Sequence, residues 1–498
     1  MYRGISRIFA HFWTEVILQL IPAFYIIEKV LNGKDPDDCR GLLHVRAGGR
    51  EMNKEMTAGK PGKMILNFTI PIFVGNIFQQ LYSMADTVIV GKFVGNEALA
   101  AVGACGTLMF LIIGFLLGLT AGFTVITAQH YGAGNLQAMR QSVASGAILS
   151  AAVSLILTIL SMAMMKDILR WMHTPADMYG QAYGYIMVIC GGIAAQTLYN
   201  LLASILRALG DSRRPLYFLI LAALLNIVLD LLLIIKFRMG AAGAAYATVI
   251  SQGVSGLLCL LYIIRKVPEL HLGKEDWKMN WDLAKWQMKI GFPMAFQFSI
   301  TAIGTIVVQS ALNMLGSVAV AGFSAASKIE QVVTQAYVAL GTAMATYCAQ
   351  NVGAGRIDRI RKGFRSAAWM GAVYAVATGI LIFFFGKYMT ALFVSHNVGR
   401  IMEYVDIYLK CVGISFIPLA VVNLYRNGIQ GMGYGLLPMT AGIAELIGRS
   451  GAALAASHFG SYAGICLASP AAWVLAGTLL IWMYARIMKQ YKLKGMLK

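Results

Sequence analysis

The sequence is poor in charge, and this scarcity sets its class. Only 13% of the 498 residues are charged, whereas 58% are hydrophobic. A soluble globular chain is about one quarter charged and about half apolar. The composition therefore excludes an ordinary soluble protein and predicts an integral, all-α membrane protein, because lipid leaves backbone polar groups no partners outside a helix.

Sequence motifs with the residue spacing of a metal site, a phosphate-binding loop or a catalytic site are also lacking. The seven cysteines are scattered, with no CxxC pair, so neither a zinc site nor a disulfide framework is indicated. The Gly-Ala-Gly segments lack the Lys-Ser/Thr that would make a phosphate loop. No nucleophile–base constellation appears. We therefore expect no enzyme activity, no cofactor and no bound metal other than Na⁺ at a coupling site.

Basic residues are in excess, with 41 Lys and Arg against 22 Asp and Glu, but they lie in short connectors between apolar runs. This placement is typical of membrane topology determinants and not of a nucleic-acid surface. The even-numbered connectors are the more basic, as with Arg207, Arg213 and Arg214 in one of them. We expect a multi-pass protein of the cytoplasmic (plasma) membrane with both ends of its helical core in the cytoplasm.

Long apolar runs are abundant, and a membrane helix needs about 20 such residues. The runs predict twelve transmembrane helices, at about 66–90, 98–128, 142–165, 183–206, 215–236, 241–264, 287–313, 318–348, 366–386, 402–427, 436–456 and 463–486.

The chain also repeats itself. The segment AQHYGAGN (128–135) recurs as AQNVGAGR (349–356), 221 residues later, and ALGDSRRP (208–215) pairs with GMGYGLLP (431–438). Two homologous six-helix halves of one orientation are predicted. The expected divisions are an N-terminal extension (1–60), a first lobe (61–264), a cytoplasmic linker (265–286), a second lobe (287–488) and a basic cytoplasmic tail (489–498).

The extension contains FWTEVILQLIPAFYII (12–27), which is too short and too interrupted for a confident span. It is interpreted as an interfacial helix, as a thirteenth span, or as a dispensable segment upstream of a start at Met52 or Met56. The dispensable segment is the preferred interpretation. A signal peptide is not indicated, since a basic start and a small-residue cleavage site are lacking.

Two carboxylates of the first half lie inside predicted helices without a basic partner. In LLNIVLDLLLI (224–234), Asn226 and Asp230 are one helical turn apart, and Asp86 precedes Lys92 as Asp230 precedes Lys236, by six residues or roughly 9 Å. Thr248 enters from the same side. The four side chains could bind a monovalent cation or share protons. The alternative is that each bonds a neighbouring backbone.

The second half has a different set of ionisable residues. Acid and base are equal in number there, and Glu445 and Arg449 are spaced to pair along one helix. Structural ion pairs are the preferred interpretation for Lys328, Glu330, Glu445 and Arg449. By the repeat offset, Asn226 corresponds to Arg449 and Asp230 to Ala453, so coupling-ion chemistry is expected in the first half alone. Pro71 is expected to bend the first span.

The combination of MADTVIVG, QHYGAGN, RALGDSRRP and LNIVLD followed by GAAYATVISQ resembles the MATE (multidrug and toxic compound extrusion) family, over about residues 60 to 490. The resemblance implies a V-shaped exporter that alternates between outward-open and inward-open states, driven by Na⁺ or H⁺. It assigns Asp86, Asn226, Asp230 and Thr248 to the coupling site, and Gln79, Tyr185 and Asn200 to the substrate cavity. Thr301 stands where some members carry a coupling Glu.

The resulting hypothesis is a monomeric secondary antiporter that exports small amphipathic, cationic organic molecules and has membrane lipid as its other partner. One alternative is a flippase for lipid-linked precursors, which would need basic residues in its cavity, and the first-half spans contain none. The other is a membrane enzyme or receptor, for which no motif is found. The sequence leaves the choice between Na⁺ and H⁺ open, and also the physiological substrate.

Overall fold

A computed structural model describes residues 56–172, 174–391 and 398–495 of the chain. The predictions for the segment 12–27 and for a start at Met52 lie outside the described residues. Every described regular element is helical, as the scarcity of charge and the long apolar runs predict.

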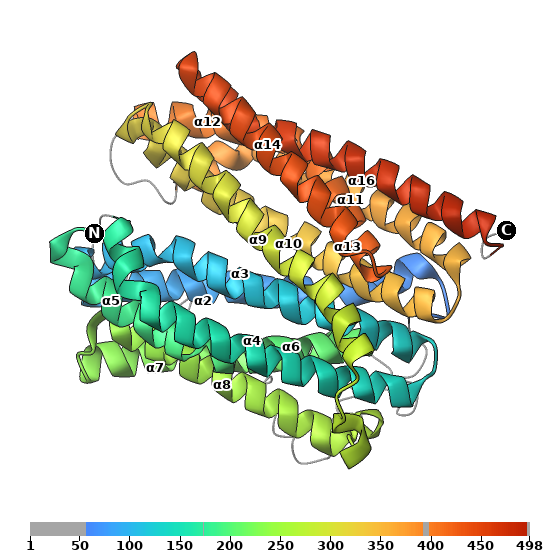
Figure 1. Cartoon of the computed structure of the whole chain (residues 1–498). Coiled ribbons are helices and arrows are strands. Elements are labelled where there is room, and N and C mark those ends of the chain that lie inside the picture. The colour runs from blue at the N-terminus through green and yellow to red at the C-terminus, as the bar shows by residue number, and fades with distance from the viewer. Residues whose placement is uncertain (1–55, 173, 392–397, 496–498) are drawn as a thin grey trace, which may run out of the picture. The chain divides into compact units, whose positions relative to one another are not determined.

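The first lobe is a bundle of long helices that runs from blue to green in Figure 1. Its elements are α2 (Pro61–Phe93), α3 (Asn96–Gly132), α4 (Leu136–Trp171), α5 (Ala176–Gly191), α6 (Ile193–Ala208), α7 (Arg213–Asp230), the π-helix η2 (Leu231–Lys236) and α8 (Gly240–Lys266).

The second lobe repeats this plan from yellow to red, after a linker that contains the short 3-10 helices η3 (Pro268–Leu270) and η4 (Lys274–Trp277). Its elements are α9 (Trp281–Asn313), α10 (Ser317–Gly353), α11 (Ile357–Ala391), α12 (Val398–Ile414), α13 (Phe416–Gly431), α14 (Leu436–His458), α15 (Tyr462–Cys466) and α16 (Ala468–Leu493).

Eight helices of the described chain are long and apolar enough to cross a membrane, or ten spans if each of two bent pairs counts as one. The bent pairs are α5 with α6 (47°) and α12 with α13 (51°), so each of the predicted spans at 183–206 and 402–427 contains a bend that the sequence did not indicate. At the first break a Cβ on Gly192 would lie 2.1 Å from the Val249 side chain of α8. The two other long helices of the predicted twelve are α10 and α14, which carry ionisable residues.

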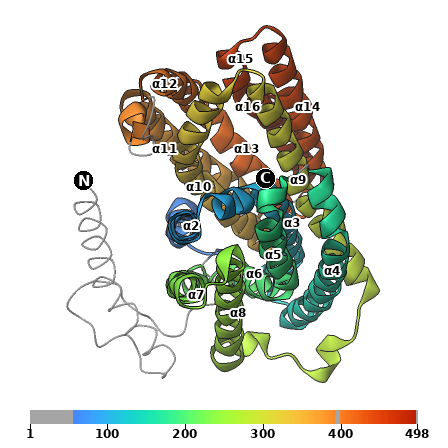
Figure 2. The same cartoon turned by 90° about the vertical axis from the view of Figure 1, so that its left-hand side faces the viewer.

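The two lobes, which Figure 2 shows end-on, touch through glycines at the C-terminal ends of α3 and α10. A Cβ on Gly132 would lie 2.1 Å from the carbonyl oxygen of Gln350, and a Cβ on Gly353 would lie 1.8 Å from that of Gln129. Only glycine permits such an approach of two helix backbones. Both glycines belong to the repeated AQxxGAG segments.

The glutamines of the same segments exchange hydrogen bonds between the lobes. Gln129 Nε2 donates to the carbonyl oxygen of Gly431 at 3.2 Å, and Gln350 Nε2 donates to that of Ala208 at 2.7 Å. Ala208 and Gly431 are the last residues of α6 and α13, where helix carbonyls lack an intrahelical partner. Each lobe therefore caps a helix of the other in the same way.

Substitution of Gly353 by Ala should destabilise the protein by about 1–3 kcal/mol, because the new methyl group overlaps the backbone of α3. Gly103→Ala is the matched control, since a Cβ on Gly103 of α3 meets nothing within 4 Å. There the gain in helix propensity should stabilise by roughly 0.5–1 kcal/mol. Thermal unfolding of the purified protein measures both, and changes of the same sign would contradict the prediction.

Candidate functional site

The two carboxylates predicted to bind the coupling ion come from two helices of the first lobe that pack side by side. Asp86 lies on α2 and is half-buried, while Asn226 and Asp230 lie on α7 and are 1% and 0% exposed. Thr248 on α8 is also buried. The four residues whose depths matched in the sequence therefore belong to three helices in mutual contact.

A chain of hydrogen bonds joins three of these residues. Asn226 Nδ2 donates to Thr248 Oγ1 at 3.4 Å, and Thr248 Oγ1 donates to Asp86 Oδ2, also at 3.4 Å. The carboxyl groups of Asp86 and Asp230 are close enough to interact electrostatically. Both distances are long for hydrogen bonds, whether the donor is N–H or O–H, so the polar groups lie together without being tightly paired.

Several oxygens of this site have no hydrogen-bond partner among the described residues, although they are buried: Asp86 Oδ1, Asn226 Oδ1, Asp230 Oδ1 and Asp230 Oδ2. A buried carboxylate with neither a base nor a donor is costly. The donor set consists of carboxylate, amide and hydroxyl oxygens, which suit a hard cation such as Na⁺, or a proton shared by the carboxyl groups.

The backbone changes its winding immediately after Asp230. Helix α7 ends at this residue and continues as the π-helix η2. Single turns of π-helix are rare and often occur at functional sites. The other end of α7 is capped by Asp211, whose Oδ1 accepts hydrogen bonds from the backbone N–H groups of Arg213 and Arg214, both at 3.1 Å.

A second polar layer lies one helical turn away from the first. Tyr82 precedes Asp86 by one turn of α2, and Gln252 follows Thr248 by one turn of α8. Gln252 Nε2 donates to the Tyr82 hydroxyl at 3.4 Å, and Gln79 also interacts with this hydroxyl. Tyr82 and Gln252 were missed in the sequence, although their i, i±4 spacing to the predicted residues was a usable signal.

The other residues predicted to line the cavity, Tyr185 and Asn200, lie on α5 and α6 and not on the three helices of the coupling residues. Tyr185 is buried on α5, and its hydroxyl donates to the sulfur of Met109 at 3.2 Å. Asn200 on α6 is half-buried and forms no hydrogen bond to the coupling residues in the described part of the chain. Pro71 is buried inside α2, which continues as one helix through it.

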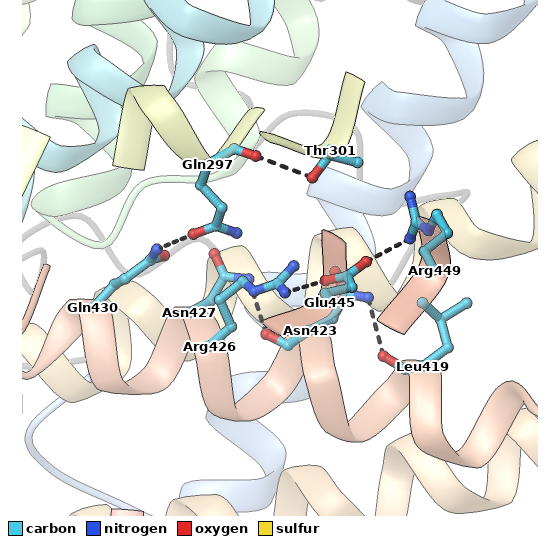
Figure 3. Close-up of polar contacts among 9 residues, drawn as sticks. All are labelled: Gln297, Thr301, Leu419, Asn423, Arg426, Asn427, Gln430, Glu445 and Arg449. Carbon is cyan, nitrogen blue, oxygen red and sulfur yellow. Dashed lines mark hydrogen bonds and ion pairs between the residues drawn. The ribbon is translucent and has the colours of Figure 1, made fainter. Parts of the chain in front are cut away.

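The second lobe contains a buried ion-pair cluster, which Figure 3 shows with Arg426 and Arg449 on either side of the Glu445 carboxylate. Nη2 of Arg426 and Nη2 of Arg449 each lie 2.5 Å from a Glu445 oxygen. The pairing of Glu445 with Arg449 follows the predicted spacing. Arg426 was missed, so the expected equality of acids and bases was wrong: this cluster has two bases for one acid.

Amide and hydroxyl groups surround the cluster in Figure 3. The side-chain amides of Gln430 on α13 and Gln297 on α9 form a hydrogen bond at 2.7 Å, and Thr301 Oγ1 donates to the backbone carbonyl oxygen of Gln297 at 3.0 Å. Of the two remaining predicted charges, Glu330 accepts a hydrogen bond from Tyr408, and Lys328 is exposed. Lys328 has no ion pair among the described residues, in contrast to the expected structural pairing.

Comparison with known proteins gives a consistent picture. The family described as MatE matches residues 71–232 and again 293–449. The probable multidrug resistance protein YpnP of Bacillus subtilis is 30% identical over 75% of this chain and 83% of its own length. An FAD transporter of Shewanella oneidensis is 24% identical over 86% of this chain and 96% of its own.

Solved structures show the same fold. An outward-facing structure of a multidrug resistance MATE family transporter superposes with a TM-score of 0.84, at 23% identity, over 88% of this chain and 98% of its own. The double match to one family model agrees with the internal repeat.

Substitution of Glu445 by Gln should destabilise the protein by about 3–5 kcal/mol, because it leaves two buried guanidinium groups without their shared carboxylate. Asp406→Asn is the control in the same lobe, since Asp406 pairs with Lys410 at 2.5 Å but both side chains are at least one third exposed. That change should cost about 1 kcal/mol or less. Thermal unfolding compares the two, and equal losses would contradict the assignment of Glu445 as the anchor of the cluster.

Proposed function

Since this chain belongs to the MATE family, we propose that it is a secondary active exporter of small organic molecules, driven by the inward movement of Na⁺ or H⁺. The observation that carries the proposal is the first-lobe group of Asp86, Asn226, Asp230 and Thr248, with its buried and unpartnered oxygens. An isolated carboxylate inside a membrane segment is a functional site by default, because only a ligand or a proton offsets its cost.

In the proposed cycle, the coupling ion binds between Asp86 and Asp230, while the Asn226 and Thr248 oxygens complete its shell. One Na⁺ or one proton would remove part of the repulsion between the two carboxylates. Binding therefore draws α2 and α7 together at this level. The choice between the two ions depends on solvation within the site, and the same carboxylates serve both.

Helix α2 carries this change toward the second lobe. It packs against α7 in its own lobe and against α10 and α11 in the other. Pro71 lies 15 residues before Asp86 and has no N–H for the carbonyl of Asn67, so the helix is weakened there. We propose that ion binding at Asp86 changes the course of α2 near Pro71 and favours one of two alternating-access states.

For the substrate we propose small amphipathic molecules, with organic cations as the first class to test. Cavity residues Gln79, Tyr185 and Asn200 are assigned on the resemblance alone. A lipid-linked precursor flippase is not favoured, since the buried Arg426 and Arg449 of the second lobe are engaged by Glu445 and no described base pairs with Asp86 or Asp230 in the first lobe. We further propose a monomer in the cytoplasmic membrane with both core termini in the cytoplasm.

Replacement of Asp86 or Asp230 by Asn should abolish ion-driven export, because an amide accepts neither a proton nor the full charge of Na⁺. We expect gradient-driven transport of a cationic dye in proteoliposomes to fall to the level of vesicles without protein, since intramembrane carboxylates of this kind carry the coupling ion. The measurement applies a Na⁺ gradient and a pH gradient separately, and the gradient that drives wild-type uptake identifies the ion.

Asp167→Asn is the control for this experiment. Asp167 lies on α4 in an exposed pair with Arg170 at 3.7 Å, far outside the buried group, so transport should stay at the wild-type level. If Asp86→Asn and Asp230→Asn proteins insert normally and still move dye against either gradient, the coupling site is misassigned.

A further inference from the structure

The second lobe carries a pocket of about 650 Å³ on its outer surface, between α11, α13 and α16. Arg361, Phe364, Arg365 and Trp369 line it from α11, Tyr425 from α13 and Tyr484 from α16. The pocket belongs to a different part of the fold from both the first-lobe carboxylates and the Glu445 cluster, and the proposed function uses none of its residues.

The face of α11 that borders this pocket places it at the edge of the membrane. Exposed apolar side chains follow one another along that face at helical spacing, from Trp369 (72% exposed) through Val373 and Val376 to Ile380. Such a stripe on a membrane protein faces lipid tails, and an exposed Trp at its end is typical of the membrane–water interface. Arg365 and Arg361 lie one and two turns beyond Trp369, roughly 6 and 12 Å along the axis. That is the depth of lipid headgroups.

The two arginines have no anionic partner in the described chain. No described carboxylate lies within ion-pair distance of Arg361 or Arg365. The Tyr484 hydroxyl is buried and likewise has no hydrogen-bond partner among the described residues. Nearby, Phe364 packs on the Tyr484 ring at 4.2 Å and on the Tyr425 ring at 5.1 Å between centroids, which gives the pocket a firm apolar wall.

In the first lobe, the charge of the equivalent arginine is neutralised by a carboxylate of the chain itself. Arg140 precedes Arg361 by the repeat interval of 221 residues and opens α4 as Arg361 opens α11. Its Nε lies 3.4 Å from Oδ2 of Asp276, a buried residue of η4 in the linker. Asp276 thus supplies Arg140 with an oxygen anion from the chain itself. The second lobe offers the arginine, and a pocket, without the anion.

We propose that this pocket binds the headgroup phosphate of an anionic phospholipid. Arg361 and Arg365 contact the phosphate oxygens as Asp276 contacts Arg140, and the acyl chains lie along the stripe from Trp369 to Ile380. Basic pockets between membrane helices on the cytoplasmic side bind headgroups in this way. The apolar wall and the adjoining lipid-facing stripe favour a lipid over free phosphate, which could use only the arginines.

The test is native mass spectrometry of the purified full chain, titrated with phosphatidylglycerol and, separately, with phosphatidylcholine. Wild type should retain one phosphatidylglycerol more tightly than phosphatidylcholine. Arg361→Gln/Arg365→Gln should weaken that binding by at least about tenfold, since each basic residue near an anionic surface contributes on the order of 1 kcal/mol. Arg361→Lys/Arg365→Lys, which keeps both charges, should retain the preference.

Arg140→Gln is the matched control, because Arg140 is already neutralised by Asp276, and its lipid affinity should equal that of wild type. The proposal is overturned if wild type shows no preference for phosphatidylglycerol, if the double Gln variant binds it equally well, or if Arg140→Gln loses as much. It is also overturned if excess inorganic phosphate displaces the lipid completely, since the site would then be one for a free anion. Dye transport is not part of the readout, so the outcome is independent of the proposed function.

Discussion

The association of the two lobes depends on a close contact between two helix backbones, that of α3 in one lobe and that of α10 in the other. Membrane helices gain little from burying apolar side chains against one another, so association depends on close van der Waals contact and hydrogen bonds. Gly132 and Gly353 supply the contact, and Gln129 and Gln350 supply the hydrogen bonds. A repeated segment that could be mistaken for a ligand loop is therefore explained by the contact between its two copies.

The two lobes share a scaffold and divide the charges unequally. Helix α7 carries Asp230, whose counterpart by the repeat offset is Ala453 on α14, fully buried like Asp230 itself. Where α7 has Asn226, α14 has Arg449, which pairs with one oxygen of Glu445 while Arg426 pairs with the other. The buried group of the first lobe therefore has two acids without a base, Asp86 and Asp230, and the Glu445 cluster of the second lobe has two bases for one acid. An ion that enters and leaves can offset the first imbalance, whereas the second is held permanently by packing.

Much of the fold and half of the site could be predicted from the sequence. The length of an apolar run, the interval between repeats and the depth of a residue below a span end can all be counted in residues along the chain. The bends at Gly192 and Ser415 were missed, since hydropathy is the same for a straight and a broken helix. The π-helix after Asp230 was missed because LLLIIK contains neither Gly nor Pro to signal it. Arg426 was missed because its polar neighbours in NLYRNGIQ (423–430) resemble the approach to a connector.

Connectivity explains why two equivalent arginines differ in their partners. A chain of two repeats has one linker, which leaves α8 and must reach the start of α9. On its way it packs η4 against α4 and delivers Asp276 to Arg140. In the described part of the chain no such segment brings a carboxylate to the start of α11, and Arg361 has no ion pair there. The pocket beside Arg361 has aromatic walls, and in the proposed complex a lipid phosphate takes the place there that Asp276 takes beside Arg140, so that the two lobes would differ in lipid binding.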